Sequence, residues 1–254
     1  ARMLWDGDAE LARRIVQQLF RFGIETETEN ARLLTLMEEI APHEPRFLSD
    51  PRVVEIVAAV RQRAQRTNSS DAGYNASVLF WAPSVAGRDG IGDAIIGLIA
   101  IMGSARDKTG SMVAANGYQA LDVLTRELDN IVATLELSGA ETEALTAPVI
   151  TALEEFWTVA AGNSLVFAPF AIPFPNAPEP VVIYNWTLIS LMFAKRVGAV
   201  DRIEAVIASA VQNEALASEI TRARARFFAV ETGGVINPQT IDGETRVAFY
   251  AALA

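Results

Sequence analysis

Apolar residues recur at the spacing of an α-helix through most of this 254-residue chain. The stripe is clearest at 121–135, and comparable stripes occupy 11–20, 33–40, 53–60 and 145–157. Runs that alternate apolar and polar residues, the pattern of a half-buried strand, are scarce. Because 51% of the residues are hydrophobic, the stripes can bury a large core. We therefore predict an all-α, irregular multi-helix globular fold with about nine or ten helices and little or no sheet.

Several helix boundaries carry capping signals. Asp50 before Pro51 predicts an N-cap followed by proline in the first turn. Ser138 and Glu141 have the spacing of a capping box, in which each residue satisfies a backbone N–H of the other. The glycine-rich stretch 87–103 predicts a short helix around an apolar run rather than a strand. Further helices are predicted at 184–197, 200–211, 216–230 and 243–253.

A polar stretch at 67–77 contains small residues and one glycine. This composition is typical of a mobile loop. We predict a single helical domain over 1–254 that contains this loop. The loop leaves open an alternative, in which it joins two lobes at 1–66 and 78–254.

A proline-rich stretch at about 163–182, called the Pro–Phe segment below, interrupts the helical pattern. Proline fixes φ and lacks an N–H group, so we predict a long extended segment that does not enter a sheet interior. Its interleaved apolar side chains are Phe167, Phe170, Ile172 and Phe174. Such a strip is too apolar to lie free in water and must cover a groove. The groove belongs to its own subunit or to a neighbour's, and the sequence leaves both alternatives open.

The uncharged stretch 156–178 is long enough to span a bilayer. However, Pro169, Pro173 and Pro175 interrupt it. We therefore expect a soluble protein with no transmembrane segment, located in the cytoplasm or in an assembled particle.

The chain is acidic, with 21 basic and 31 acidic residues and a net charge of −10. This balance argues against wrapping a nucleic acid through bulk charge. Five arginines in two local clusters are nevertheless candidate phosphate contacts: Arg61, Arg63, Arg66, Arg222 and Arg226. The competing interpretation, which we prefer, is that these side chains form salt bridges with the many acids. Nucleic-acid binding therefore requires that the two clusters meet in space.

The absence of cysteine and the presence of a single histidine, His43, remove most catalytic chemistry. Disulfides, thiolate nucleophiles and cysteine-ligated metals are excluded, and so are sites that need two histidines. His43 with Glu38, Glu39 and Glu44 could form a carboxylate-rich metal site, but we favour a solvated helix end. We expect no catalytic residue, no metal and no cofactor.

A helical chain of this size with an apolar extended segment resembles helical coat and nucleocapsid subunits. The resemblance is one of architecture only, and no motif is shared. We expect a non-enzymatic, self-associating structural or scaffold subunit, a homo-oligomer in which the Pro–Phe segment docks on a neighbour. The alternative is a helical enzyme or carrier whose apolar cavity, near the aromatic residues of 156–186, holds a hydrophobic ligand.

Overall fold

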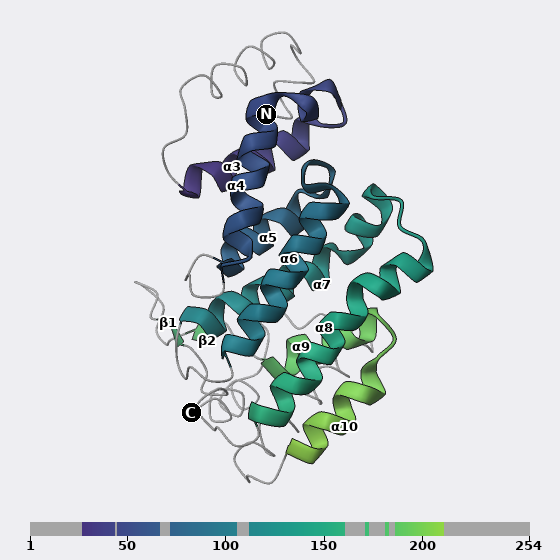
Figure 1. The fold of residues 1–254 in the computed structure, drawn as a ribbon. Helices are drawn as coiled ribbons and strands as arrows, with labels where there is room; N and C mark the ends of the chain where they lie inside the picture. Colours follow the sequence, from purple (N-terminus) through teal and green to yellow (C-terminus); the bar gives the residue numbers. More distant parts are fainter. Residues whose placement is uncertain are drawn as a thin grey trace.

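The computed structural model describes these parts of the chain (Figure 1): residues 27–43, 45–66, 72–105, 112–160, 171–172, 181–182 and 186–210. Within them the backbone is mostly helical, with eight α-helices. This confirms the predicted all-α fold. None of the described helices is long and apolar enough to cross a bilayer.

Most of the helices follow the predicted stripes. In chain order they are α3 (Glu27–Ile40), α4 (Pro51–Ala64), α5 (Ala72–Trp81), α6 (Pro83–Ala105), α7 (Met112–Thr134), α8 (Gly139–Ala160), α9 (Trp186–Arg196) and α10 (Val200–Ala210). A 3-10 turn, η1 (Pro45–Ser49), precedes α4. Asp50 caps α4 as predicted, because its side chain accepts from the Arg52 N–H at 2.9 Å. The helices predicted at 11–20, 216–230 and 243–253 lie outside the described residues.

Helix α5 packs against α4, α6 and α7 and lies among them. Residues 75–80 are all buried. Ser77 satisfies its hydroxyl within the helix by donating to the Gly73 carbonyl at 2.8 Å. The predicted mobile loop at 67–77 is therefore wrong for 72–77, and 67–71 lie outside the described residues. The small residues that are typical of a loop are instead buried on α5, among the helices that pack against it.

The buried side chains form one main cluster that extends from α3 to α10. It includes Val60 from α4, Leu79 from α5 and Leu121 from α7. A smaller cluster between α3 and α4 contains Met37 and Val53. Residues on both sides of the predicted loop thus share one cluster. The division of the whole chain into one domain or two lobes stays a prediction.

The glycine-rich stretch forms a long helix, α6, rather than the short helix predicted. Gly87 breaks its path with a φ of 64°, in the left-handed region that favours glycine. Gly97 has another role, because a Cβ at this position would lie 2.1 Å from the Ala64 carbonyl oxygen. Glycine at 97 therefore lets the end of α4 lie directly against α6.

Aromatic side chains fill the interior between α7, α8 and α9. The rings of Phe156 and Trp186 stack with centroids 4.7 Å apart, and Tyr118 meets Trp186 edge-on at 5.9 Å. The buried Trp157 donates its indole N–H to the Ser190 hydroxyl at 3.1 Å. These contacts join the three helices through apolar surface and one satisfied polar pair.

The Pro–Phe segment contains the only strands among the described residues, β1 (Ala171–Ile172) and β2 (Val181–Val182). They pair antiparallel, with Ala171 opposite Val182 and Ile172 opposite Val181. The predicted extended backbone is present at these four residues. Because the pairing is antiparallel, the chain direction reverses between β1 and β2. The prediction of one long extended segment did not include this reversal. The rest of 163–182 lies outside the described residues.

Candidate functional site

The connection between α7 and α8 is a tight left-handed turn. The Leu137 N–H donates to the Val132 carbonyl at 3.0 Å, and the Glu136 N–H donates to the Ala133 carbonyl at 3.3 Å. This pair of hydrogen bonds defines a Schellman motif, in which the residue after the helix is left-handed. Glu136 has a φ of 50° and is the one non-glycine residue of the described chain with a positive φ. Glycine is the usual residue at such a position, so Glu136 is strained.

The predicted capping box begins α8 directly after this turn. The Ser138 N–H and hydroxyl both donate to Glu141 Oε2, at 2.8 and 2.7 Å. In return the Glu141 N–H donates to the Ser138 hydroxyl oxygen at 3.3 Å. The box is therefore confirmed, and it fixes the Glu141 carboxylate at the first turn of α8.

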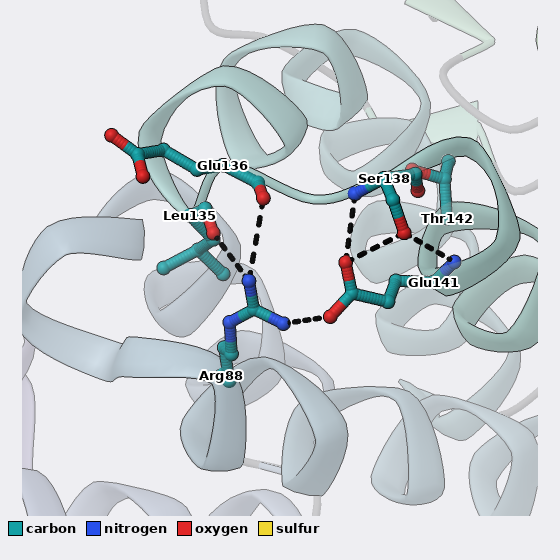
Figure 2. Close-up of polar contacts among 6 residues, drawn as sticks. All are labelled: Arg88, Leu135, Glu136, Ser138, Glu141 and Thr142. Atoms are coloured by element: carbon teal, nitrogen blue, oxygen red, sulfur yellow. Dashed lines mark hydrogen bonds and ion pairs between the residues drawn. The ribbon is translucent and has the colours of Figure 1, made fainter.

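Arg88 of α6 contacts both the end of α7 and the start of α8 (Figure 2). Its Nη1 donates to Glu141 Oε1. Its Nη2 donates to the carbonyls of Leu135 and Glu136, at 3.0 and 3.3 Å. These carbonyls belong to the C-terminal end of α7, where the helix dipole is negative, so a cation is favoured there. One guanidinium thus stabilises both the end of α7 and the start of α8.

The same contacts determine the charge of Glu141. The Ser138 N–H, the Ser138 hydroxyl and the Arg88 guanidinium lower the pKa of Glu141 from 4.5 to about 2. The carboxyl is therefore ionised throughout the physiological pH range. Such a weak base does not suit proton transfer near neutrality.

An open cleft, called the junction cleft below, lies beside this ion pair and has a volume of about 290 Å³. It is lined by one ion pair and five apolar residues: Arg88, Glu141, Ile91, Leu135, Leu137, Ala144 and Leu145. Ligand pockets usually occupy about 300–1,000 Å³, so this cleft is at the small end of the range. Its size and lining suit one apolar side chain with hydrogen-bond acceptors beside it.

The first arginine cluster lies at the end of α4. Arg61 Nε pairs with Asp93 Oδ2 of α6 at 2.5 Å, and Gln65 donates to the other carboxylate oxygen at 2.6 Å. Arg63 is half-buried and Arg66 is exposed. The contact of Arg61 matches the salt-bridge interpretation for that residue.

The second cluster, Arg222 and Arg226, lies outside the described residues. Whether the two clusters meet therefore stays a prediction. Elsewhere arginines also connect helices: Arg202 of α10 binds Glu154 of α8 through two hydrogen bonds, of 2.9 and 2.8 Å. An ion pair between Arg196 and Asp129 joins α9 to α7.

Glu38 belongs to the candidate metal cluster, for which we favoured a solvated helix end, but it makes a structural contact instead. Its carboxylate accepts from the Ser84 N–H and hydroxyl at 3.1 and 2.7 Å and from the Val85 N–H at 3.0 Å. It therefore caps the start of α6, where Ala82 offers no side-chain acceptor. No group of three or more acidic or histidine side chains that could hold a metal occurs in the described part of the chain. Glu44 lies outside that part.

Sequence reasoning identified the capping box but missed its partner Arg88. The contacts of Arg88 join residues 47 to 53 positions apart, so no local pattern announces them. The predicted docking residues are placed only in part: Ile172 lies in β1, whereas Phe167, Phe170 and Phe174 lie outside the described residues.

Comparison of the chain with family models, with curated proteins and with solved structures finds no match. No activity is therefore transferred from a relative. The chemistry of the described residues is the basis for the functional inference that follows.

Proposed function

We propose that this protein is a non-enzymatic structural subunit that self-associates, with its Pro–Phe segment docking on a neighbouring copy. The segment combines apolar side chains with prolines, which reduce the conformational entropy lost when a strip of chain docks. The biological role that we propose for such a subunit is that of a coat-like or scaffold protein.

The observation that carries the proposal is the antiparallel pairing of β1 with β2. It holds Ile172 opposite Val181, so the sequence between them, PFPNAPEP, begins and ends at one place. Four of these eight residues are proline. The pairing fixes the backbone of Ile172, one of the predicted docking residues, and proline fixes φ wherever it occurs. Both lower the entropy that is lost on docking.

The chemistry of the junction cleft also supports a binding role over a catalytic one. Its walls are apolar, and its one carboxylate, Glu141, has a pKa of about 2. The described arginines Arg61, Arg88, Arg196 and Arg202 hold pairs of helices together. These charges support the fold rather than a reaction.

The alternative, a helical enzyme or carrier for a hydrophobic ligand, has weaker support. The cavity was expected near the aromatic residues of 156–186. Phe156, Trp157 and Trp186 are buried, and the Phe156 ring contacts the rings of both tryptophans. A lipid or pigment that co-purifies with the protein and is detected by native mass spectrometry would favour the alternative.

Sedimentation velocity of the full chain over a range of micromolar concentrations tests the proposal. The unmodified protein should sediment as a species larger than a monomer. A variant with Phe167→Ser, Phe170→Ser and Phe174→Ser should be monomeric, and circular dichroism should show unchanged helicity. A monomeric unmodified protein at high micromolar concentration would contradict the proposal.

A matched control removes apolar surface elsewhere. Val54 and Ile96 are the large hydrophobic residues with exposed side chains in the described part of the chain, at 55% and 58%. A variant with Val54→Ser and Ile96→Ser should associate like the unmodified protein. Equal loss of association in both variants would mean that general surface apolarity, and not the Pro–Phe segment, drives it.

A further inference from the structure

We propose that the junction cleft is the receptor for the Pro–Phe segment of a second copy, with one phenylalanine ring seated between α6, the α7–α8 turn and α8. This inference rests on the proposed self-association and names the surface on which the segment docks. It follows from the size, hydrogen-bond donors, charge and position of the cleft.

The size and lining of the cleft fit an aromatic side chain. Its five apolar wall residues come from α6, the turn and α8, and together with Arg88 and Glu141 they line an open cleft of about 290 Å³. Ala144 is exposed on α8 and forms the smallest side chain of the wall, which leaves room above it. A buried phenylalanine is a large hydrophobic contribution to an interface.

The polar rim fits a proline-rich backbone. Proline leaves carbonyl acceptors in the chain without matching N–H donors, so such a segment needs donors from its receptor. A guanidinium has five N–H groups. The contacts of Arg88 to Glu141, Leu135 and Glu136 use three of them. The Arg88 side chain is 52% exposed, so its Nε–H and second Nη1–H are available to carbonyl acceptors of an incoming chain.

The charge of the rim favours a neutral strip. Arg88 is paired with Glu141, and the exposed Glu136 lies on the same turn. A phosphate or an acidic peptide would meet this carboxylate and the negative end of α7. The sequence from 165 to 178, LVFAPFAIPFPNAP, carries no charge. The occupant that the rim accepts is therefore present in the chain itself.

The position of the cleft indicates that the segment comes from another copy. Figure 1 shows β1 and β2 on the opposite side of the helical body from the α7–α8 turn. Phe170 and Phe174 are at most two residues from β1, a reach of about 7 Å. Helix α7 alone, with 23 residues, is about 35 Å long. We therefore assign the docking phenylalanine to a neighbouring copy.

The test is a substitution that fills the cleft in the 254-residue chain. Ala144→Trp should raise the dissociation constant for self-association about tenfold or more, because the ring occupies the space of the incoming phenylalanine. Ala205→Trp, at an exposed position of α10 outside the cleft, should leave association unchanged. If Ala144→Trp associates like the unmodified chain, the cleft is not the receptor, although the proposed function stands. If the unmodified chain is monomeric, both proposals fail.

Cross-linking gives a readout that does not depend on the stability of the tryptophan variant. The chain has no cysteine, so single cysteines can be placed without background. One copy carries Asn176→Cys in the segment, and another carries Ala140→Cys beside the cleft. A short bismaleimide should join these two copies, but should not join Asn176→Cys to Ala205→Cys. Equal cross-linking of both pairs, or of neither when the chain self-associates, would overturn the inference.

Discussion

The α7–α8 and α9–α10 connections close with the same hydrogen bonds but have different residues in the left-handed position. At the end of α9 the Ala199 N–H donates to the Ala194 carbonyl at 2.7 Å. The left-handed residue there is Gly198, with a φ of 70°. At the end of α7 the same position is occupied by Glu136, and a side chain in this region costs about 1–2 kcal/mol. Of these two connections, only the α7–α8 connection, which borders the junction cleft, therefore has backbone strain at its left-handed residue.

The helix starts that follow the two turns differ as well. Helix α8 begins with the capping box of Ser138 and Glu141. At the start of α10 the Ala199 carbonyl accepts from the Ile203 N–H, which makes Ala199 the N-cap, and alanine has no side-chain acceptor. The α7–α8 connection therefore combines backbone strain with additional polar contacts. We infer from this comparison that the contacts of Arg88 and Ser138 offset the strain at Glu136.

The largest stability change is expected at the glycine of the α9–α10 turn. Gly198→Ala should destabilise the protein by about 1–2 kcal/mol, because a Cβ is unfavourable at positive φ. Nothing lies within 4 Å of that Cβ, so the effect is purely conformational. Urea unfolding measures it. Gly92→Ala, which also has nothing within 4 Å but lies in helical backbone, should be neutral or stabilising. Equal destabilisation by both variants would contradict the conformational explanation.

The capping residues should respond in opposite directions at the two connections. Ser138→Ala should cost about 1 kcal/mol, since it removes an acceptor for the Glu141 N–H. Ala199→Ser should stabilise α10 by up to about 1 kcal/mol, because it supplies the missing acceptor. Denaturant midpoints of both variants provide the comparison. A loss of stability in both variants would show that the missing side-chain cap does not limit the stability of α10.

Relieving the strain at Glu136 should give a smaller gain. Glu136→Gly should stabilise the fold by roughly 0.5–1 kcal/mol, since the relief of strain exceeds the entropy that glycine adds to the unfolded chain. Thermal unfolding is a sufficient measurement. Because Arg88 contacts the carbonyl and not the side chain of Glu136, self-association should be unaffected. Destabilisation would mean that the Glu136 side chain makes a contact of its own.

The smallest effect is a pH dependence at Glu141. Its pKa is about 2 in the folded state and 4.5 without these contacts, so the ionised form favours folding. This contribution is full above pH 4.5 and is lost as the pH falls toward 2. The difference in urea midpoint between the unmodified protein and Glu141→Gln should therefore shrink as the pH falls through this range. A difference that stays constant would assign the effect of the substitution to something other than charge.

Sequence patterns predicted the fold because most helices have one apolar face. The stripes at 33–40, 53–60 and 121–135 correspond to α3, α4 and α7. Helix α5 was missed because it is buried on nearly all sides, and a helix without a polar face has no stripe. Its small and polar residues then favoured a loop.

The candidate site was predictable only where its contacts are local. Ser138 and Glu141 are three residues apart, which makes the capping box visible in the sequence. Arg88 meets Glu141 from another helix, and Glu136 stands where a sequence rule favours glycine. Nothing along the chain therefore marks these two residues. The capping of α6 by Glu38 is a long-range contact of the same kind.

The central claim is that copies associate by placing the Pro–Phe segment of one in the junction cleft of another. A mixing experiment tests it most directly. One partner carries Phe167→Ser, Phe170→Ser and Phe174→Ser with an intact cleft, and the other carries Ala144→Trp with an intact segment. At a concentration between the dissociation constants of the unmodified protein and of the Ala144→Trp variant, analytical ultracentrifugation should find each variant alone as a monomer. The equimolar mixture should form a complex of one copy of each. Absence of this complex, under conditions in which the unmodified protein self-associates, would contradict the claim.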